Sequence, residues 1–223
     1  MASFVGLTKA EAAYQELRAR ILDGRLAPGS VNSIEKLALD LNVSTTPLRE
    51  AVRKLAGEYL LDAPPHREVV IAPLTIEGVQ EIYELRLILD PLAASKATRR
   101  ATPEDIKAVR EVLDASRQYQ PKELFQLNHQ LHREIYKRCG NQILVRALDS
   151  LCDRSDRYRF LLLEVDETAT KATEEHEAIV DAYARGAADS MQELVYEHIA
   201  ASQAAIVARM KTNADQALKR TKS

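Results

Sequence analysis

The chain has no tryptophan, three phenylalanines and only seven glycines among its 223 residues. Glycine-rich phosphate loops and sheets of aromatic strands need residues that are scarce in this sequence. The composition is 46% hydrophobic and 29% charged, and the apolar residues are spread through charged sequence. We therefore expect a mainly α fold, with enough chain for one large or two small domains.

Cysteine and long apolar runs are also scarce. Cys139 and Cys152 form neither a CxxC motif nor a disulfide framework, so reduced, buried thiols are expected. The longest late apolar run is FLLL at 160–163, and the start MASFVGLTKAEAAY contains no apolar core of signal-peptide length. These features predict a cytoplasmic protein without a membrane partner.

The chain has no excess charge of either sign, because 31 Lys and Arg stand against 33 Asp and Glu. A strong overall positive field for nucleic acid is therefore excluded. Any DNA binding must depend on local charge. One such place is the segment 45–57, where Arg49, Arg53 and Lys54 outnumber Glu50.

Residues 1–73 show short amphipathic segments separated by turn signals. A first apolar stripe ends at Gly24, and a second helix is expected from Ser33 as N-cap to Asn42 as a left-handed exit. A tight connection at 43–47 leads into a third stripe. Two short apolar runs then predict a hairpin. This order is typical of a winged helix-turn-helix domain.

The same stretch, from about Ala12 to Ile71, resembles the N-terminal domain of the GntR family of bacterial transcription regulators. The most specific parts are ILDGRLAPGS and VSTTPLREAVRKL. The resemblance implies a DNA-binding domain whose third helix enters the major groove with its first turn.

By this resemblance, the family's DNA contacts fall at the start of the third helix and at the tip of the wing. Arg49 has the fork geometry for a bidentate pair with guanine, and hydroxyls with free amides suit phosphate oxygens. An ion pair with glutamate or a solvated face is the alternative for Arg49. Two departures are a threonine where the family often has arginine and a wing tip without glycine. The expected DNA-binding residues are Ser44, Thr45, Thr46, Arg49, Arg53, His66 and Arg67.

Residues 74–223 read as an antiparallel all-α bundle of about six helices. A kink or break is expected at Pro91, which lies inside the first of them. The expected segments are 75–100, 103–118, 121–139, 141–165, 168–186 and 187–212.

Four of the five histidines lie in this half. Asn128 and His132 are spaced i,i+4 and share one helix face, whereas His176 and His198 come singly from later helices. Neutral imidazoles with one oxygen ligand suit zinc, nickel or manganese. By spacing alone, such histidines are more often capped or solvent-facing.

The segments LNHQLHREIYKRCGN, EEHEAIVDAYARG and LVYEHIAAS resemble the FCD effector domain of the FadR branch, and the helix number resembles its VanR-type members. The resemblance implies a divalent metal, zinc first with nickel or manganese as alternatives. It assigns the site to Asn128, His132, His176 and His198, with Asn128 in place of the usual aspartate. His129 does not match and is expected on the surface or in a groove.

The resemblance also implies a small carboxylate effector, held by the metal and an arginine. Arg86 matches the family's arginine on the first bundle helix, and Arg154 and Tyr158 lie on the fourth. An i,i+4 ion pair with Asp90 is an equally weighted role for Arg86.

These features predict a sequence-specific DNA-binding regulator, with repression relieved by effector as the expected direction. Because one short helix reads few base pairs, a homodimer on a short near-palindromic operator is expected. A regulator that senses the ion itself is the alternative. A metal-dependent bundle enzyme is disfavoured, because no HExxH or Glu-x-x-His pattern is present.

Overall fold

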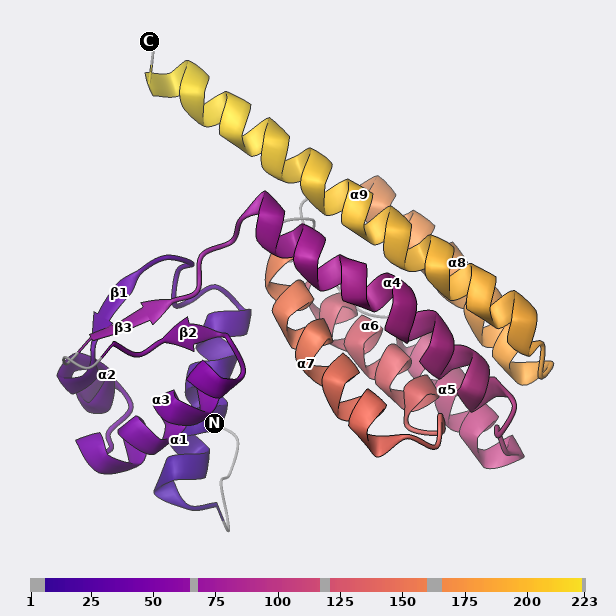
Figure 1. The fold of residues 1–223 in the computed structure, drawn as a ribbon, viewed down its shortest axis with the longest axis horizontal. Coiled ribbons are helices and arrows are strands. Elements are labelled where there is room, and N and C mark those ends of the chain that lie inside the picture. The colour runs from indigo at the N-terminus through magenta and orange to yellow at the C-terminus, as the bar shows by residue number, and fades with distance from the viewer. Residues whose placement is uncertain (1–6, 65–67, 117–120, 160–165, 222–223) are drawn as a thin grey trace. The chain divides into compact units, whose positions relative to one another are not determined.

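The computed structural model describes residues 7–64, 68–116, 121–159 and 166–221. The chain divides into two compact units, Met1–Thr75 and Ile76–Ser223 (Figure 1). The sequence had placed this division after Pro73. The expected wing residues His66 and Arg67 lie outside the described residues.

The N-terminal unit contains three helices and a small antiparallel sheet. Two of its helices begin where a side chain satisfies a free backbone amide: Thr8 Oγ1 accepts from the Glu11 amide at 3.1 Å, and Ser33 Oγ accepts from the Lys36 amide at 3.2 Å. The chain leaves the second helix through Asn42, whose φ of 53° lies in the left-handed region. The elements are α1 (Lys9–Leu22), β1 (Val31–Ser33), α2 (Ile34–Asp40), α3 (Thr45–Gly57), β2 (Leu61–Asp62) and β3 (Glu68–Ile71).

The sheet has one more strand than the expected hairpin. Its order is β1-β3-β2, with Val31 opposite Val70 and Leu61 opposite Ile71. Strand β1 has only three residues and no alternating apolar pattern, so its place depends on pairing with β3. The sheet, α1 and α3 enclose a core that includes Leu17, Leu48 and Leu55. This core fixes α3 with its polar face outward.

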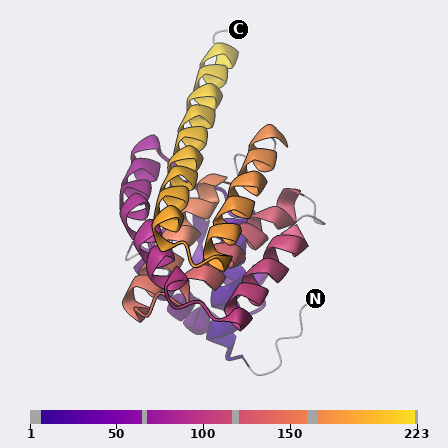
Figure 2. The same cartoon turned by 90° about the vertical axis from the view of Figure 1, so that its right-hand side faces the viewer.

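In the C-terminal unit, the described residues form six helices, as the sequence predicted (Figure 2). Helices α4 and α9 pack extensively along each other. They run antiparallel, because the Tyr83 hydroxyl lies 2.9 Å from Ser202 Oγ and Arg99 pairs with Asp189 at 2.8 Å. The helices are α4 (Ile76–Thr98), α5 (Pro103–Ser116), α6 (Pro121–Tyr136), α7 (Gln142–Arg159), α8 (Asp166–Ala184) and α9 (Ala188–Thr221).

Helix α4 continues through Pro91, so the break expected there does not occur. Proline removes one backbone hydrogen bond, but the buried face of α4 packs on both sides of it. That face includes Tyr83, Arg86, Asp90 and Ala94, and its tertiary contacts hold the helix together. None of the described helices is both long enough and apolar enough to cross a membrane.

Candidate functional site

The N-terminus of α3 carries exposed hydroxyl side chains. Ser44 is the N-cap, yet its side chain makes no capping hydrogen bond, and Thr45 and Thr46 are exposed beside it. The first amides of a helix have no intrahelical acceptor and carry the positive end of the helix dipole. This turn therefore suits phosphate oxygens.

Arg49 and Arg53 follow on the exposed face of α3, one turn apart. Neither forms an ion pair with any described residue, so the predicted alternative of a glutamate partner for Arg49 has no contact to support it. Lys54 differs, since its Nζ lies 3.6 Å from the centre of the Tyr14 ring and 3.5 Å from Glu11 Oε1. Of the basic residues on this helix, the two arginines are exposed and form no ion pair with the described residues.

In the C-terminal unit, the structure brings together three of the predicted metal ligands from three helices. His132 on α6, His176 on α8 and His198 on α9 have exposed fractions of 1%, 7% and 5%. The ring centres of His176 and His198 are 4.7 Å apart, and one nitrogen from each of the three histidines lies within 4.8 Å of the others. We call this set the three-histidine cluster.

Outer partners orient two of these rings. The Tyr136 hydroxyl donates to Asp90 Oδ2 at 3.2 Å, and its oxygen lies 3.0 Å from His132 Nδ1. Glu175 Oε2 lies 2.7 Å from His198 Nδ1. We therefore assign the protons of both rings to Nδ1, which leaves each Nε2 as a lone pair.

The two Nε2 atoms of His132 and His198 face each other at 3.3 Å. Two lone pairs at this distance repel, and a shared cation removes the repulsion. Two nitrogens on one tetrahedral zinc ion, with Zn–N bonds of 2.0–2.1 Å, lie about 3.3 Å apart. The donor atoms of the cluster therefore fit a divalent ion.

The electrostatic environment keeps the cluster neutral. Burial, followed by the charges of neighbouring histidines and of Arg159, holds the pKa values of His132 and His176 well below the usual 6.5. Burial and the nearby Arg159 and Arg86 lower the pKa of His198 to about 3. Neutral imidazole is the form that binds metal.

Two buried atoms of the candidate ligands have no hydrogen-bond partner among the described residues: Nε2 of His176, the third histidine of the cluster, and Nδ2 of Asn128. Asn128 lies one turn before His132 on α6 and is half-buried. Rotation of its amide by 180° exchanges nitrogen and oxygen, so its Oδ1 is available as a ligand atom.

Arg86 is fully buried and forms polar contacts with two neighbouring side chains. Its Nη2 lies 2.8 Å from Asp90 Oδ2, and its Nη1 donates to Ser155 Oγ at 2.7 Å. Of the two roles that the sequence allowed for Arg86, the ion pair with Asp90 is present. A role in effector binding stays a prediction.

The sequence did not single out Arg159 at the end of α7. The residue is 8% exposed, its Nη1 donates to Asp156 at 3.0 Å, and its Nη2 has no partner among the described residues. Its charge acts on all three clustered histidines. At 3.6 residues per turn, Arg159 shares a face with Ser155 and Asp156, whereas Arg154 lies about 140° from Arg159 around α7.

His129 was expected on the surface or in a groove, and the structure gives it a hydrogen-bonded contact with Asp156. It is half-buried, and its Nδ1 lies 2.7 Å from Asp156 Oδ2. Asp156 thus joins His129 to Arg159 and fixes the guanidinium from one side. Glu175 was missed because its contact with His198 crosses from α8 to α9 and follows no spacing rule, whereas the i,i+4 spacing of His132 and Tyr136 on α6 was a signal in the sequence that went unused.

Comparison with known families assigns both units. Residues 9–71 match the bacterial regulatory proteins of the gntR family, and residues 81–201, more than half of the chain, match the FCD domain.

Individual relatives and a solved structure support the same family assignment. The Nta operon transcriptional regulator of Aminobacter aminovorans is 30% identical over 176 residues, which cover 77% of this chain and 82% of the relative. The gluconate operon transcriptional repressor of Bacillus licheniformis is 28% identical over 170 residues, covering 74% and 69%. The solved structure of Escherichia coli McbR/YncC shares the fold, with a TM-score of 0.81 and 22% identity over 92% of this chain and 99% of that one. The chain belongs to the GntR family of bacterial transcriptional regulators and carries the family's helix-turn-helix domain followed by an FCD domain.

Proposed function

We propose that this regulator is an operator-binding repressor whose affinity for DNA is lowered by a small carboxylate bound at a divalent metal in the C-terminal unit. The observation that carries the proposal is the three-histidine cluster, with Nε2 atoms of His132 and His198 facing each other at 3.3 Å. Repression as the direction is supported by the name of the gluconate operon repressor among the relatives.

His132, His176 and His198 would hold the ion, with the Asn128 amide oxygen as a fourth ligand. Zinc suits three imidazoles and one oxygen, and nickel and manganese are alternatives. Bound there, the ion supplies a positive centre for a carboxylate oxygen. Tyr136 and Glu175 keep the imidazoles in the ligating tautomer.

Arg159 supplies the second positive group for the effector. Its Nη2 is buried without a partner among the described residues, and a buried guanidinium with free donors favours an anion. This feature favours a carboxylate sensor over a regulator that senses the ion itself, because an ion sensor has no use for a second cation beside the metal.

DNA binding is proposed to need two copies, each placing α3 in one half of a near-palindromic operator. The effector would favour an arrangement of the dimer that no longer matches the half-site spacing. The decrease in operator affinity that the effector causes is limited by the difference in effector affinity between the two arrangements of the dimer.

Replacing Arg49 by alanine is expected to weaken discrimination of an operator, selected from random duplexes, against random DNA by roughly 1–3 kcal/mol, because a bidentate base contact is lost. Arg53→Ala should instead weaken both DNAs alike and lower the salt slope by about one. Fluorescence anisotropy at several salt concentrations measures both, with the exposed Arg110→Ala of the other unit as control. Unchanged discrimination in Arg49→Ala would remove this residue from base readout.

Replacing Arg159 by alanine is expected to weaken carboxylate binding to the zinc-loaded protein by about 10- to 150-fold, because a charged hydrogen bond contributes about 1.5–3 kcal/mol. Arg154→Ala, on the opposite side of α7, is the matched control and should bind normally. Isothermal titration with mono-, di- and tricarboxylates provides the measurement, and circular dichroism checks that both variants fold. The reverse pattern, with loss only in Arg154→Ala, would return the effector site to the residues that the sequence indicated.

A further inference from the structure

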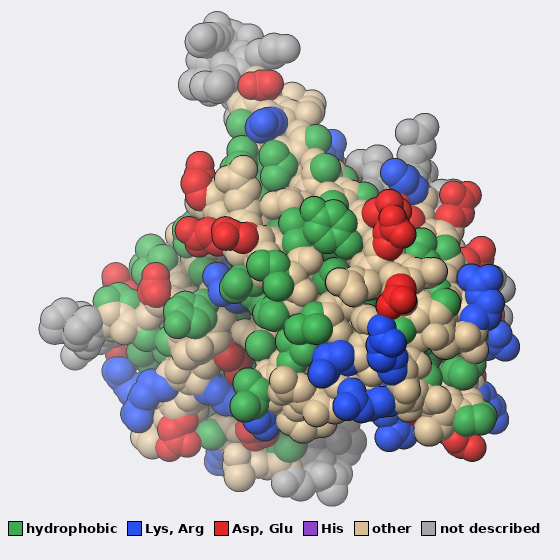
Figure 3. Space-filling model, turned by 45° about the vertical axis from the view of Figure 1, so that its right-hand side comes forward, with side chains coloured by type: hydrophobic (Ala, Val, Ile, Leu, Met, Phe, Trp, Pro, Cys, Tyr) green, Lys and Arg blue, Asp and Glu red, His purple; other side chains and the backbone are tan. Residues whose placement is uncertain are grey.

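Arg159 combines burial with an incompletely paired guanidinium. Figure 3 shows Lys and Arg side chains grouped on the lower part of one face, where they are open to solvent. Such exposed cations are hydrated and screened by salt, so they hold a small anion weakly. Arg159 is only 8% exposed, and its buried Nη2 has no hydrogen-bond partner among the described residues. Because burial strengthens a charged hydrogen bond, this nitrogen is the better donor for a carboxylate.

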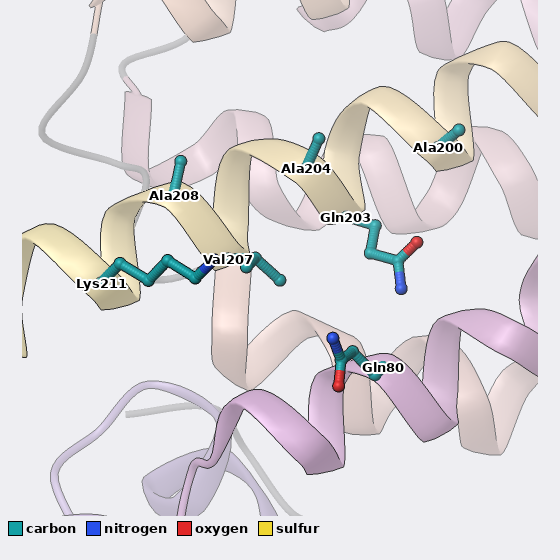
Figure 4. A pocket seen from close by; sticks show the side chains of 7 residues that line it. All are labelled: Gln80, Ala200, Gln203, Ala204, Val207, Ala208 and Lys211. Atoms are coloured by element: carbon teal, nitrogen blue, oxygen red, sulfur yellow. The ribbon is translucent and has the colours of Figure 1, made fainter.

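The groove between α4 and α9 is a poorer place for a small anion. Its volume is about 480 Å³, and its polar lining residues are Gln80, Gln203 and Lys211. Figure 4 shows the two glutamines pointing toward each other across the groove, with Lys211 toward one end. Lys211 is exposed, and none of these lining residues belongs to α6, α7 or α8. A carboxylate in this groove would meet no buried cation.

The free Nη2 of Arg159 has a cause in the contacts of Asp156. Oδ1 of Asp156 accepts from Arg159 Nη1 at 3.0 Å, whereas Oδ2 lies 2.7 Å from Nδ1 of His129. A carboxylate and a guanidinium left to themselves favour two parallel hydrogen bonds. Asp156 is 3% exposed, so water has little access to it. The second bond to Arg159 is absent because His129 holds the oxygen that would accept it.

The same contact fixes the tautomer of His129. A carboxylate oxygen only accepts hydrogen bonds, so Nδ1 of His129 carries the proton and donates it to Asp156. Asp153, one turn before Asp156 on α7, places its Oδ1 3.8 Å from the same nitrogen. His129 on α6 therefore lies beside two carboxylates of α7, and it is hydrogen-bonded to the one that also binds Arg159.

We propose that His129 is a positioning residue for effector binding: by holding Oδ2 of Asp156, it keeps Nη2 of Arg159 available to a carboxylate. The inference rests on the proposed function, which assigns the effector to Arg159, and it explains why this arginine is able to bind. Without the donor of His129, Asp156 turns its second oxygen toward Nη2 and completes a bidentate pair. The effector then has to displace a carboxylate that is already in place.

His129 is separate from the three-histidine cluster, although it lies three residues before His132 on α6. Its Nδ1 contacts α7, and the group of nitrogens that could share an ion contains His132, His176 and His198. Loss of the His129 side chain should therefore leave the zinc ligands in place. Zinc affinity serves as a control within each variant, because a general disturbance of the site would lower it.

Isothermal titration of mono-, di- and tricarboxylates into the zinc-loaded full chain tests the role of His129. His129→Leu removes the donor and keeps a side chain of similar size. It should weaken carboxylate binding about tenfold or more, because the effector must break a charged hydrogen bond to reach Nη2, and it should bind zinc as the wild type does. His129→Ala provides a second variant without the donor. His129→Asn is the conservative control, since its amide nitrogen replaces Nδ1 as donor and should restore binding.

A double-mutant cycle tests whether His129 acts through Asp156. Asp156→Ala removes both oxygens, so adding His129→Leu to it should cause no further loss of carboxylate affinity. Circular dichroism confirms that every variant folds. Unchanged carboxylate binding in His129→Leu, or an equal loss in the Asp156→Ala background, would overturn the proposal. Two zinc ions per chain, one of them lost in His129→Leu, would make His129, Asp153 and Asp156 a second metal site and overturn it as well.

Operator release by the same carboxylates separates this inference from the proposed function. Carboxylate binding that depends on His129 but leaves the operator bound would keep the role of His129 and reject the function. Zinc-dependent release that is the same in His129→Leu as in the wild type would reject only the inference. If no carboxylate binds the zinc-loaded wild-type chain, both are rejected.

Discussion

Replacing His176 by alanine is expected to lower zinc affinity by more than about a hundredfold, because one of three buried imidazole ligands is removed. Changing an outer partner of a ligand typically lowers affinity 10- to 100-fold, and loss of a ligand lowers it further. Glu175→Gln should accordingly give the smaller, 10- to 100-fold loss, since Glu175 only holds the His198 ring. Competition with a chromophoric chelator measures both, with His66→Ala in the N-terminal unit as the histidine control.

The zinc affinity should also resist acid. The pKa values of all three clustered histidines lie below the usual value, that of His198 at about 3, so protons compete poorly for the ligating nitrogens. We expect nearly constant affinity from pH 7.5 to 5.5, after correction for the chelator. Three histidines of ordinary pKa near 6.5 would each reduce the affinity about tenfold at pH 5.5. A loss of that size would contradict the neutral cluster.

Replacing Asp90 by alanine is expected to lower the free energy of unfolding by about 3–5 kcal/mol, because it leaves a buried charge without its partner. Arg86 is 0% exposed, and Asp90 Oδ2 lies 2.8 Å from its Nη2. The substitution also removes the acceptor of the Tyr136 hydroxyl. Urea denaturation of zinc-free protein measures the change, which is a large part of a typical total stability.

Two further variants serve as controls for Asp90. Glu111→Ala breaks the exposed pair with Lys107 on α5 and should change stability by no more than about 0.5 kcal/mol. The double variant Arg86→Met with Asp90→Leu should recover most of the loss, because it removes both charges and keeps the volume. A loss below about 1 kcal/mol in Asp90→Ala would show that Arg86 finds another partner.

Local chemistry made much of the fold predictable from sequence. Ser33 and Asn42 mark the start and the end of α2 as expected, because capping and a left-handed exit depend on residues close in the chain. Strand β1 was missed because its three residues become a strand only by pairing with β3. Pro91 was expected to kink or break α4, but the helix continues through it, because packing on both sides of the proline outweighs the lost hydrogen bond.

The candidate site was likewise predictable only where its residues follow a pattern in the sequence. The resemblance indicated the three histidines, and the structure brings them together. Arg159 was not predicted because the sequence does not show which side of α7 faces the three-histidine cluster, and an effector role for Arg154 stays a prediction. Glu175 was missed for a related reason, since it contacts His198 only through the packing of α8 against α9, whereas Tyr136 lies four residues after His132 on α6 and could have been noticed by that spacing.

The most direct test of metal-dependent effector control is the release of a selected operator duplex, followed by fluorescence anisotropy while small carboxylates are titrated into the full chain. Zinc-loaded and chelator-treated protein are compared. We predict that a carboxylate releases the operator from the zinc-loaded protein and fails to do so after zinc removal. Equal release after complete removal of zinc, or release by zinc alone with no active carboxylate, would contradict the proposed mechanism.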